Sequence, residues 1–211
     1  SALRKLAKRL PAGLSGAAIR EPARLVCGPD VTVAVDSTGF STSTAPGRCA
    51  ETASAADART KAVLACGVAS SRTADVKRLQ PVMEEVQRTG IGVSTVVAGK
   101  GCGAEHAHAG ALEAPGQDAE ARMPARKHEA KPLRAASKPG PKGLRRNRTW
   151  RGIDEAAYAM RAVAETVNAM LKRKTGEAEC GKGRGAAAEG MKLTAIAHNI
   201  VILFEDMRVI I

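Results

Sequence analysis

The 211-residue chain has very few aromatic side chains: one Trp, one Tyr and two Phe. Each aromatic ring buries roughly 150–250 Å² of surface, so a core without rings buries less area per residue. We therefore expect a fold of marginal stability, built from Ala, Val, Leu and Ile. The chain also lacks any run of 18 apolar residues, and its basic stretch at residues 122–148 holds no amphipathic helix with large apolar anchors, so we expect no membrane partner.

Cysteines are few and are not paired in the sequence. Their number is odd and their spacing wide, at Cys27, Cys49, Cys66, Cys102 and Cys180. This spacing excludes both a disulfide framework and a paired-cysteine zinc site. The first twenty residues lack the apolar segment of a secretory signal, so a cytoplasmic location is expected.

Positive charge is concentrated in two stretches of this chain, whose net charge is +12. Residues 1–28, a basic N-terminal segment, hold six basic residues and one acidic residue. Residues 122–148 hold ten basic residues against Glu129 alone, inside an irregular loop of about 115–150 that is rich in Pro and Gly. A polyanion is the natural partner of such clusters, because neutralising phosphates releases counterions. A solvated basic loop is the competing interpretation.

Strand-like and helix-like runs alternate along the chain. Strands are expected at residues 31–40, 60–70 and 91–99, the first presenting Asp36 at its carboxyl end, and the small polar residues 41–60 are expected to form a loop. Helices are expected at residues 2–10, 75–90, 103–113, 154–174 and 186–204. The alternation indicates an α/β layer architecture with at least one parallel strand pair.

Polar side chains form a stripe on the helix expected at residues 154–174. Tyr158, Arg161, Glu165 and Lys172 fall within an arc of about 60° on a helical wheel. The opposite face is apolar and should be buried; it holds Val163, Val167, Met170 and Leu171. Taken alone, the stripe is explained by an i,i+4 ladder of salt bridges.

The spacing of these four residues resembles the Y-R-E-K signature of DDE transposases of the insertion-sequence-four type. Other segments resemble the same family in the same order: VAVDSTGF, SSRTADVKRLQPVM, VVAGKGCGAE and LTAIAHNIVIL. The resemblance implies a DDE catalytic-type domain over residues 29–211 with a ribonuclease-H-like α/β fold, a mixed sheet flanked by helices. Only one strand-like run separates the first strand from the helix at residue 75, where the family has two. We therefore expect an incomplete sheet and an internal deletion.

The resemblance also implies a function, DNA transposition by metal-dependent phosphoryl transfer. Members of the family cleave and transfer DNA strands at transposon ends with two divalent ions, expected to be Mg²⁺, held by two Asp and one Glu. On this sequence it assigns Asp36 and Glu165 to catalysis and metal binding. It assigns contacts with double-stranded DNA to Tyr158, Arg161, Lys172 and Lys100. A homodimer on DNA and a nucleoid-associated location are further expectations.

The third carboxylate of the family's site is missing. Gly99 stands where the second Asp belongs, while Cys102 and Gly103 stand where a Tyr and a further Asp belong. Each exchange needs one adenine-to-guanine base change, a pattern that suggests mutational decay. We expect weakened Mg²⁺ binding and absent or very weak strand cleavage, which leaves it uncertain whether the chain is an enzyme. The alternative is a non-catalytic basic DNA-binding remnant. Asp75 is a poor replacement, because a carboxylate at a helix start is explained by the helix dipole.

Two other interpretations concern residues 99–108. The run Gly99-Lys-Gly-Cys-Gly103 after a strand imitates a phosphate-binding loop, but it fits no established glycine pattern. Cys102, His106 and His108 suggest zinc, but a fourth ligand and the usual pairing are lacking.

Overall fold

The computed structural model describes residues 14–42, 49–70, 74–103, 119–124, 154–175, 178–179 and 184–209. The helix expected at residues 2–10, nearly all of the helix expected at 103–113, and most of the basic loop lie outside these ranges. None of the helices in the described ranges has the length and apolar character needed to cross a bilayer.

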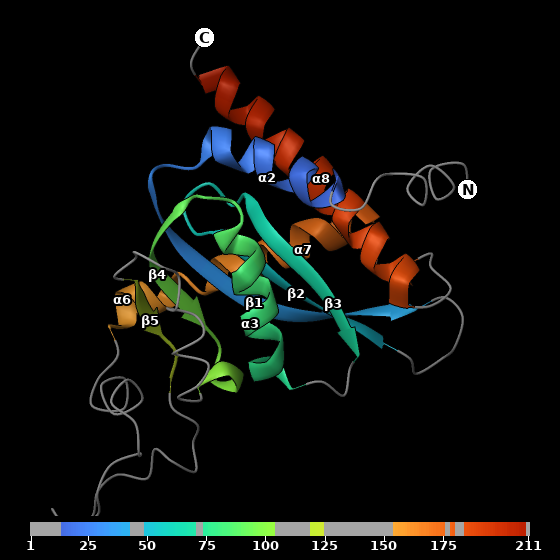
Figure 1. Ribbon diagram of the computed structural model, residues 1–211, viewed down its shortest axis with the longest axis horizontal. Helices are drawn as coiled ribbons and strands as arrows, with labels where there is room; N and C mark the ends of the chain where they lie inside the picture. The colour runs from blue at the N-terminus through green and yellow to red at the C-terminus, as the bar shows by residue number, and fades with distance from the viewer. Residues whose placement is uncertain are drawn as a thin grey trace, which may run out of the picture.

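The centre of the fold is one mixed, open sheet with the strand order β3-β2-β1-β4-β5 (Figure 1). An antiparallel meander forms one side of it: β1 (Asp30–Thr42), β2 (Cys49–Asp57) and β3 (Val63–Ser70). On the other side β4 (Gly92–Ala98) runs parallel to β1, and the short β5 (Glu120–Arg122) runs parallel to β4. The two-residue β6 (Ala178–Glu179) pairs with the far end of β1. This is the expected α/β, ribonuclease-H-like arrangement, with a sheet that ends on a three-residue edge strand.

The expectation of a loop at residues 41–60 is wrong, because β2 occupies Cys49–Asp57. The meander therefore has both strands between β1 and the next helix, and a deletion at this place is not needed. The sequence pattern did not predict β2 because most of its residues are Ala, Thr or Ser, with little alternation of large apolar and polar side chains. Its position between β1 and β3 supplies hydrogen-bond partners on both edges, and this pairing outweighs weak strand propensity.

Helices cover both faces of the sheet (Figure 1). Helix α3 (Asp75–Gln87) packs on one face, where Leu79, Met83 and Val86 join the main core. Helix α7 (Ala162–Thr175) packs on the other, and α2 (Leu14–Val26) lies beside α8 (Arg184–Val209). The helices expected at 75–90 and 186–204 are thus confirmed.

Alternation along β1 decides which side chains meet α7. Val33 and Val35 belong to the core under α3, whereas Ala34 packs with Val97 of β4 and Ala164 of α7. Because successive side chains of a strand point to opposite faces, Asp36 belongs to the α7 face. The predicted site residue Asp36 therefore lies on the α7 side of the sheet.

The single helix expected at residues 154–174 is in fact two. Helix α6 (Glu155–Ala159) ends before Met160 and Arg161, and α7 begins at Ala162. The backbone N–H groups of both junction residues donate three residues back, to Ala157 and Tyr158, so the junction is a tight turn. Arg161 therefore sits at a helix break next to the sheet.

Two cysteine thiols are expected to be unreactive in the native protein. Burial raises the pKa of Cys27 to about 11 and that of Cys66 to about 12, against a usual value of 9.0. Only the thiolate is nucleophilic, so both should resist a disulfide reagent at pH 8 and react once the protein is unfolded. Since these pKa values are higher in the folded state, stability should be intact below pH 9.0 and fall as the pH rises toward 11. Rapid labelling of both thiols in the folded protein would contradict this expectation.

Candidate functional site

Asp36 and Gly99 are neighbours at the point where two parallel strands separate. The last paired residues of β1 and β4 are Val35 and Ala98, so Asp36 and Gly99 follow them side by side. Asp36 does not end its strand as expected, because β1 continues to Thr42 by pairing with β2. It lies instead where β4 turns away into η1 (Lys100–Cys102), and among the described residues β1 has no strand partner on that side until β6 pairs with Ser41.

Arg161 joins the carboxylates that the sequence assigns to the site. Its Nη1 lies 3.5 Å from Oδ1 of Asp36, and its Nη2 lies 2.5 Å from Oε1 of Glu165. A Cβ atom built on Gly99 would have the same Nη1 as its nearest heavy atom, at 4.0 Å. The three positions assigned to the family's carboxylates thus surround one guanidinium, although 125 residues separate Asp36 from Arg161.

Asn168 is a site residue that the sequence analysis missed. Its Nδ2 donates to Oδ2 of Asp36 at 3.3 Å, and its Oδ1 accepts from the hydroxyl of Ser54 at 2.7 Å. Asn168 is 4% exposed and Ser54 is fully buried, so both groups depend on these bonds. The available signal was the place of Asn168 on the helical wheel, one turn after Glu165 and next to Arg161 at the edge of the polar stripe.

The electrostatics of the site follow from partial burial. Burial raises the pKa of Asp36 above its usual 3.8; Arg161 opposes this effect, and the nearby negative charge of Glu165 adds to it. For Arg161, burial disfavours the charge, but Glu165 and Asp36 outweigh it and the pKa rises. The guanidinium is therefore a permanent cation between two acids.

The remaining predicted site residues are placed less centrally. Tyr158 of α6 lies against Arg161, whose Cζ is 5.9 Å from the ring centroid. Lys172 lies two turns after Glu165 on α7 and is partly buried. Lys100 begins η1, directly after Gly99. The Val167 and Leu171 side chains are fully buried, as the apolar face of the wheel predicts.

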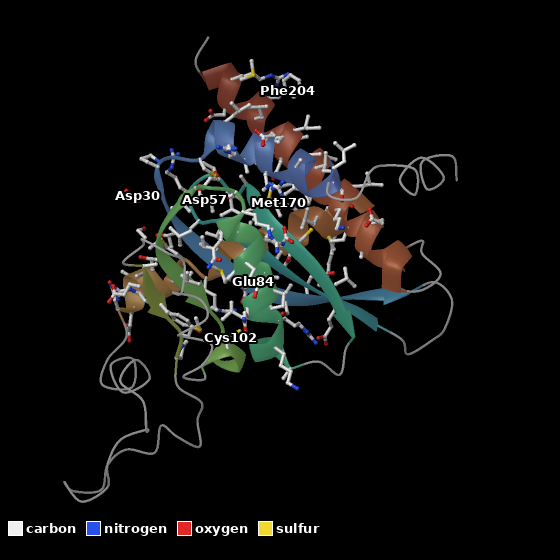
Figure 2. The ribbon with its side chains drawn as sticks, viewed as in Figure 1. Asp30, Asp57, Glu84, Cys102, Met170 and Phe204 are labelled. Atoms are coloured by element: carbon white, nitrogen blue, oxygen red, sulfur yellow. The ribbon has the colours of Figure 1, made fainter. Side chains whose placement is uncertain are left out.

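The turn after β4 contains Cys102 and contacts Asp75, two residues that the sequence analysis considered as possible ligands. Asp75 starts α3, accepts from Arg78 at 3.3 Å, and packs directly on Gly101. It lines a cavity of about 250 Å³ that Asp36 and Gly99 also reach, but its carboxylate is already engaged with α3. Cys102, labelled in Figure 2, is buried in the core that α3 covers, as a small apolar residue would be. The two histidines that suggested zinc lie outside the described residues.

The carboxylates present do not fit a pair of divalent ions. In the described part of the chain, no group of three or more His, Cys, Asp or Glu side chains is arranged to hold a metal. Hard cations such as Mg²⁺ need several oxygen ligands at about 2.1 Å. Among the described residues, the two acids at Arg161 are Asp36 and Glu165, and both are paired with its guanidinium.

One comparison with known proteins gives a match. A family model described as a transposase DDE domain matches residues 28–200, which is most of the chain. Searches of curated proteins and of solved structures gave no match.

Proposed function

The chain belongs to the transposase DDE domain family, whose members act on DNA in transposition through a divalent metal. From this premise we propose that the chain binds transposon-end DNA without cleaving it. The observation that carries the proposal is the site around Arg161, where Gly99 supplies no carboxylate and the guanidinium is paired with the two that remain. A phosphoryl-transfer site of this kind needs negative charge to bind its metals, and the two acids with Arg161 leave a net charge of only −1 here.

The proposal includes a finer assignment within the family. The Y-R-E-K spacing supports the insertion-sequence-four type, with Asp36 and Glu165 as what remains of a Mg²⁺ site. Tyr158, Lys172 and Lys100 are proposed to contact the DNA backbone, and Arg161 to do so only when its ion pairs open. The catalytic-type domain is taken as residues 29–211, following the basic segment 1–28. A homodimer on DNA in the nucleoid completes the proposal.

Binding and cleavage can be tested on the same DNA. The full chain should retard linear and supercoiled plasmid DNA in a gel, and the affinity should fall steeply with salt, by about 10³ between 50 and 200 mM if about six phosphates are neutralised. The supercoiled plasmid should remain uncut with either Mg²⁺ or Mn²⁺. Absent binding, or robust nicking, would contradict the proposal.

The contribution of the basic stretch has a matched control. The double change Arg145→Gln and Arg146→Gln removes two charges from residues 122–148 and should reduce both affinity and the salt slope. Lys77→Gln with Arg208→Gln removes the same charge from exposed helix positions outside that stretch and should have little effect. Equal losses for the two pairs would show that only net charge matters.

A further inference from the structure

We infer that Asn168 is a positioning residue: together with Ser54, its amide holds the Asp36 carboxylate in one orientation, with Oδ1 turned toward the α6–α7 break. The inference rests on the proposed function, because that proposal makes Asp36 one of the two acids left in the site. It goes further by naming the group that aims this acid. Asn168 acts through Asp36 and does not itself contact DNA or metal.

The sheet places the two partners of Asn168 side by side. Ser54 and Asp36 are register partners on the antiparallel strands β2 and β1, so their side chains leave the same face of the sheet. Helix α7 packs on both strands at this face, and its Asn168 bonds to the Ser54 hydroxyl and to the Asp36 carboxylate. Polar side chains from three elements thus meet at one point under α7.

The direction of the two hydrogen bonds fixes the orientation of the amide. The hydroxyl of Ser54 donates to Oδ1 of Asn168 at 2.7 Å, and an amide oxygen can only accept. The NH₂ group of the same amide then points at Asp36, where Nδ2 donates to Oδ2 at 3.3 Å. If the amide turned over, its oxygen would face the ionised carboxylate with no proton between them. Ser54 therefore decides which end of Asn168 meets Asp36.

The consequence is that one oxygen of Asp36 is held and the other is aimed. With Oδ2 on Asn168, Oδ1 lies 3.5 Å from Nη1 of Arg161, the atom nearest to a Cβ built on Gly99. Asn168 lies one turn after Glu165 on α7, so the same amide ties the helix of one acid to the strand of the other. Asn168 is only 4% exposed and offers almost no surface to DNA. What it supplies is the direction in which Asp36 faces the site.

Nuclear magnetic resonance of the isotope-labelled full chain tests this role without DNA or metal. The three-bond couplings of Asp36 Cγ to the backbone N and carbonyl C of the same residue report its χ1 angle. In wild type they should correspond to one staggered rotamer, and Asn168→Leu should move both toward an average over several rotamers. The bond that the backbone N–H of Ser37 makes to Asp36 is local to β1 and stays in every variant. A folded Asn168→Leu protein with wild-type couplings would overturn the inference.

Two substitutions on β2 make the result specific. Ser54→Ala removes the donor that orients the amide and should shift the Asp36 couplings in the same direction as Asn168→Leu, by a smaller amount. Strand β2 is already rich in alanine, so this variant also covers the case in which Asn168→Leu fails to fold. Thr52→Val removes another buried hydroxyl from the same face of the strand and should leave the couplings unchanged. Unchanged couplings in Ser54→Ala, or an equal shift in Thr52→Val, would overturn the inference.

A kinetic measurement uses Gly99→Asp, the variant expected to nick DNA. Adding Asn168→Leu to it should lower kcat for nicking at least about tenfold, because a misaimed carboxylate slows the chemical step. The KM for plasmid DNA should stay the same, because Asn168 is buried. A rise in KM with kcat unchanged would overturn the inference. Since the coupling measurement needs neither DNA nor activity, failure of the proposed function and failure of this inference are distinguishable.

Discussion

Replacing Gly99 with Asp is expected to give metal-dependent nicking of supercoiled DNA, at least about 100-fold above the wild-type background. The introduced carboxylate would start beside Asp36 on the parallel strand pair, in the position that we propose for the family's second Asp. The structure has room for it, since the nearest heavy atom to a Cβ at this position is Arg161 Nη1, at 4.0 Å. A third carboxylate would bring the net charge around Arg161 to −2 and favour a divalent ion over the internal pairing.

Gly99→Asn is the matched control for this experiment. It has nearly the shape of the Asp variant but adds no charge, so it should remain inactive with either metal. Both variants should fold, because the Gly99 backbone does not have the positive φ found at Gly90. A folded Gly99→Asp protein that binds DNA and does not nick it would show that the site has a second defect.

Much of the site could be read from local spacing. Arg161 and Glu165 are four residues apart, and the ion pair that this spacing predicts is present although the helix breaks at Arg161. The buried Val167 and Leu171 likewise follow from the helical period. Such contacts are set within one helix, so one segment of sequence contains the information.

The contacts that complete the site come from tertiary pairing instead. Asp36 meets Gly99 because β1 and β4 are parallel neighbours, a register that neither strand specifies by itself. Ser54 meets Asn168 across 114 residues of chain, and it lies on the strand that the sequence pattern had suggested to be a loop. The small residues of β2 carry little periodic signal in the sequence. Their role follows from the tertiary structure, because α7 packs on this strand.

The largest expected effect on stability is at Asn199 of α8. Its side chain donates to the carbonyl oxygens of Ile19 and Val63, at 2.9 and 2.7 Å, and accepts from the Val63 N–H at 2.8 Å. Asn199 is 1% exposed, so Asn199→Leu would leave three buried backbone groups without this partner. We expect a loss of about 3–5 kcal/mol in the free energy of unfolding, measured by urea denaturation.

The neighbouring position provides the control for polarity. Ile200 is 41% exposed on the same helix, and Ile200→Asn should change the free energy of unfolding by less than about 0.5 kcal/mol. A similar loss for both variants would indicate general damage to α8. An unchanged midpoint for Asn199→Leu would show that the backbone of β3 and α2 does not need this side chain.

The Asn199 variant also links the stability of the fold to the site. Met191 and Ala195 of α8 share one core cluster with Val167 and Leu171, the buried side chains of the helix that carries Glu165. If α8 loosens from β3, α7 loses part of its support, and the Arg161–Glu165 pair should become more mobile relative to Asp36. In the Gly99→Asp background, Asn199→Leu should therefore lower nicking well below the denaturation temperature. Unchanged nicking would show that α7 is held by the sheet alone.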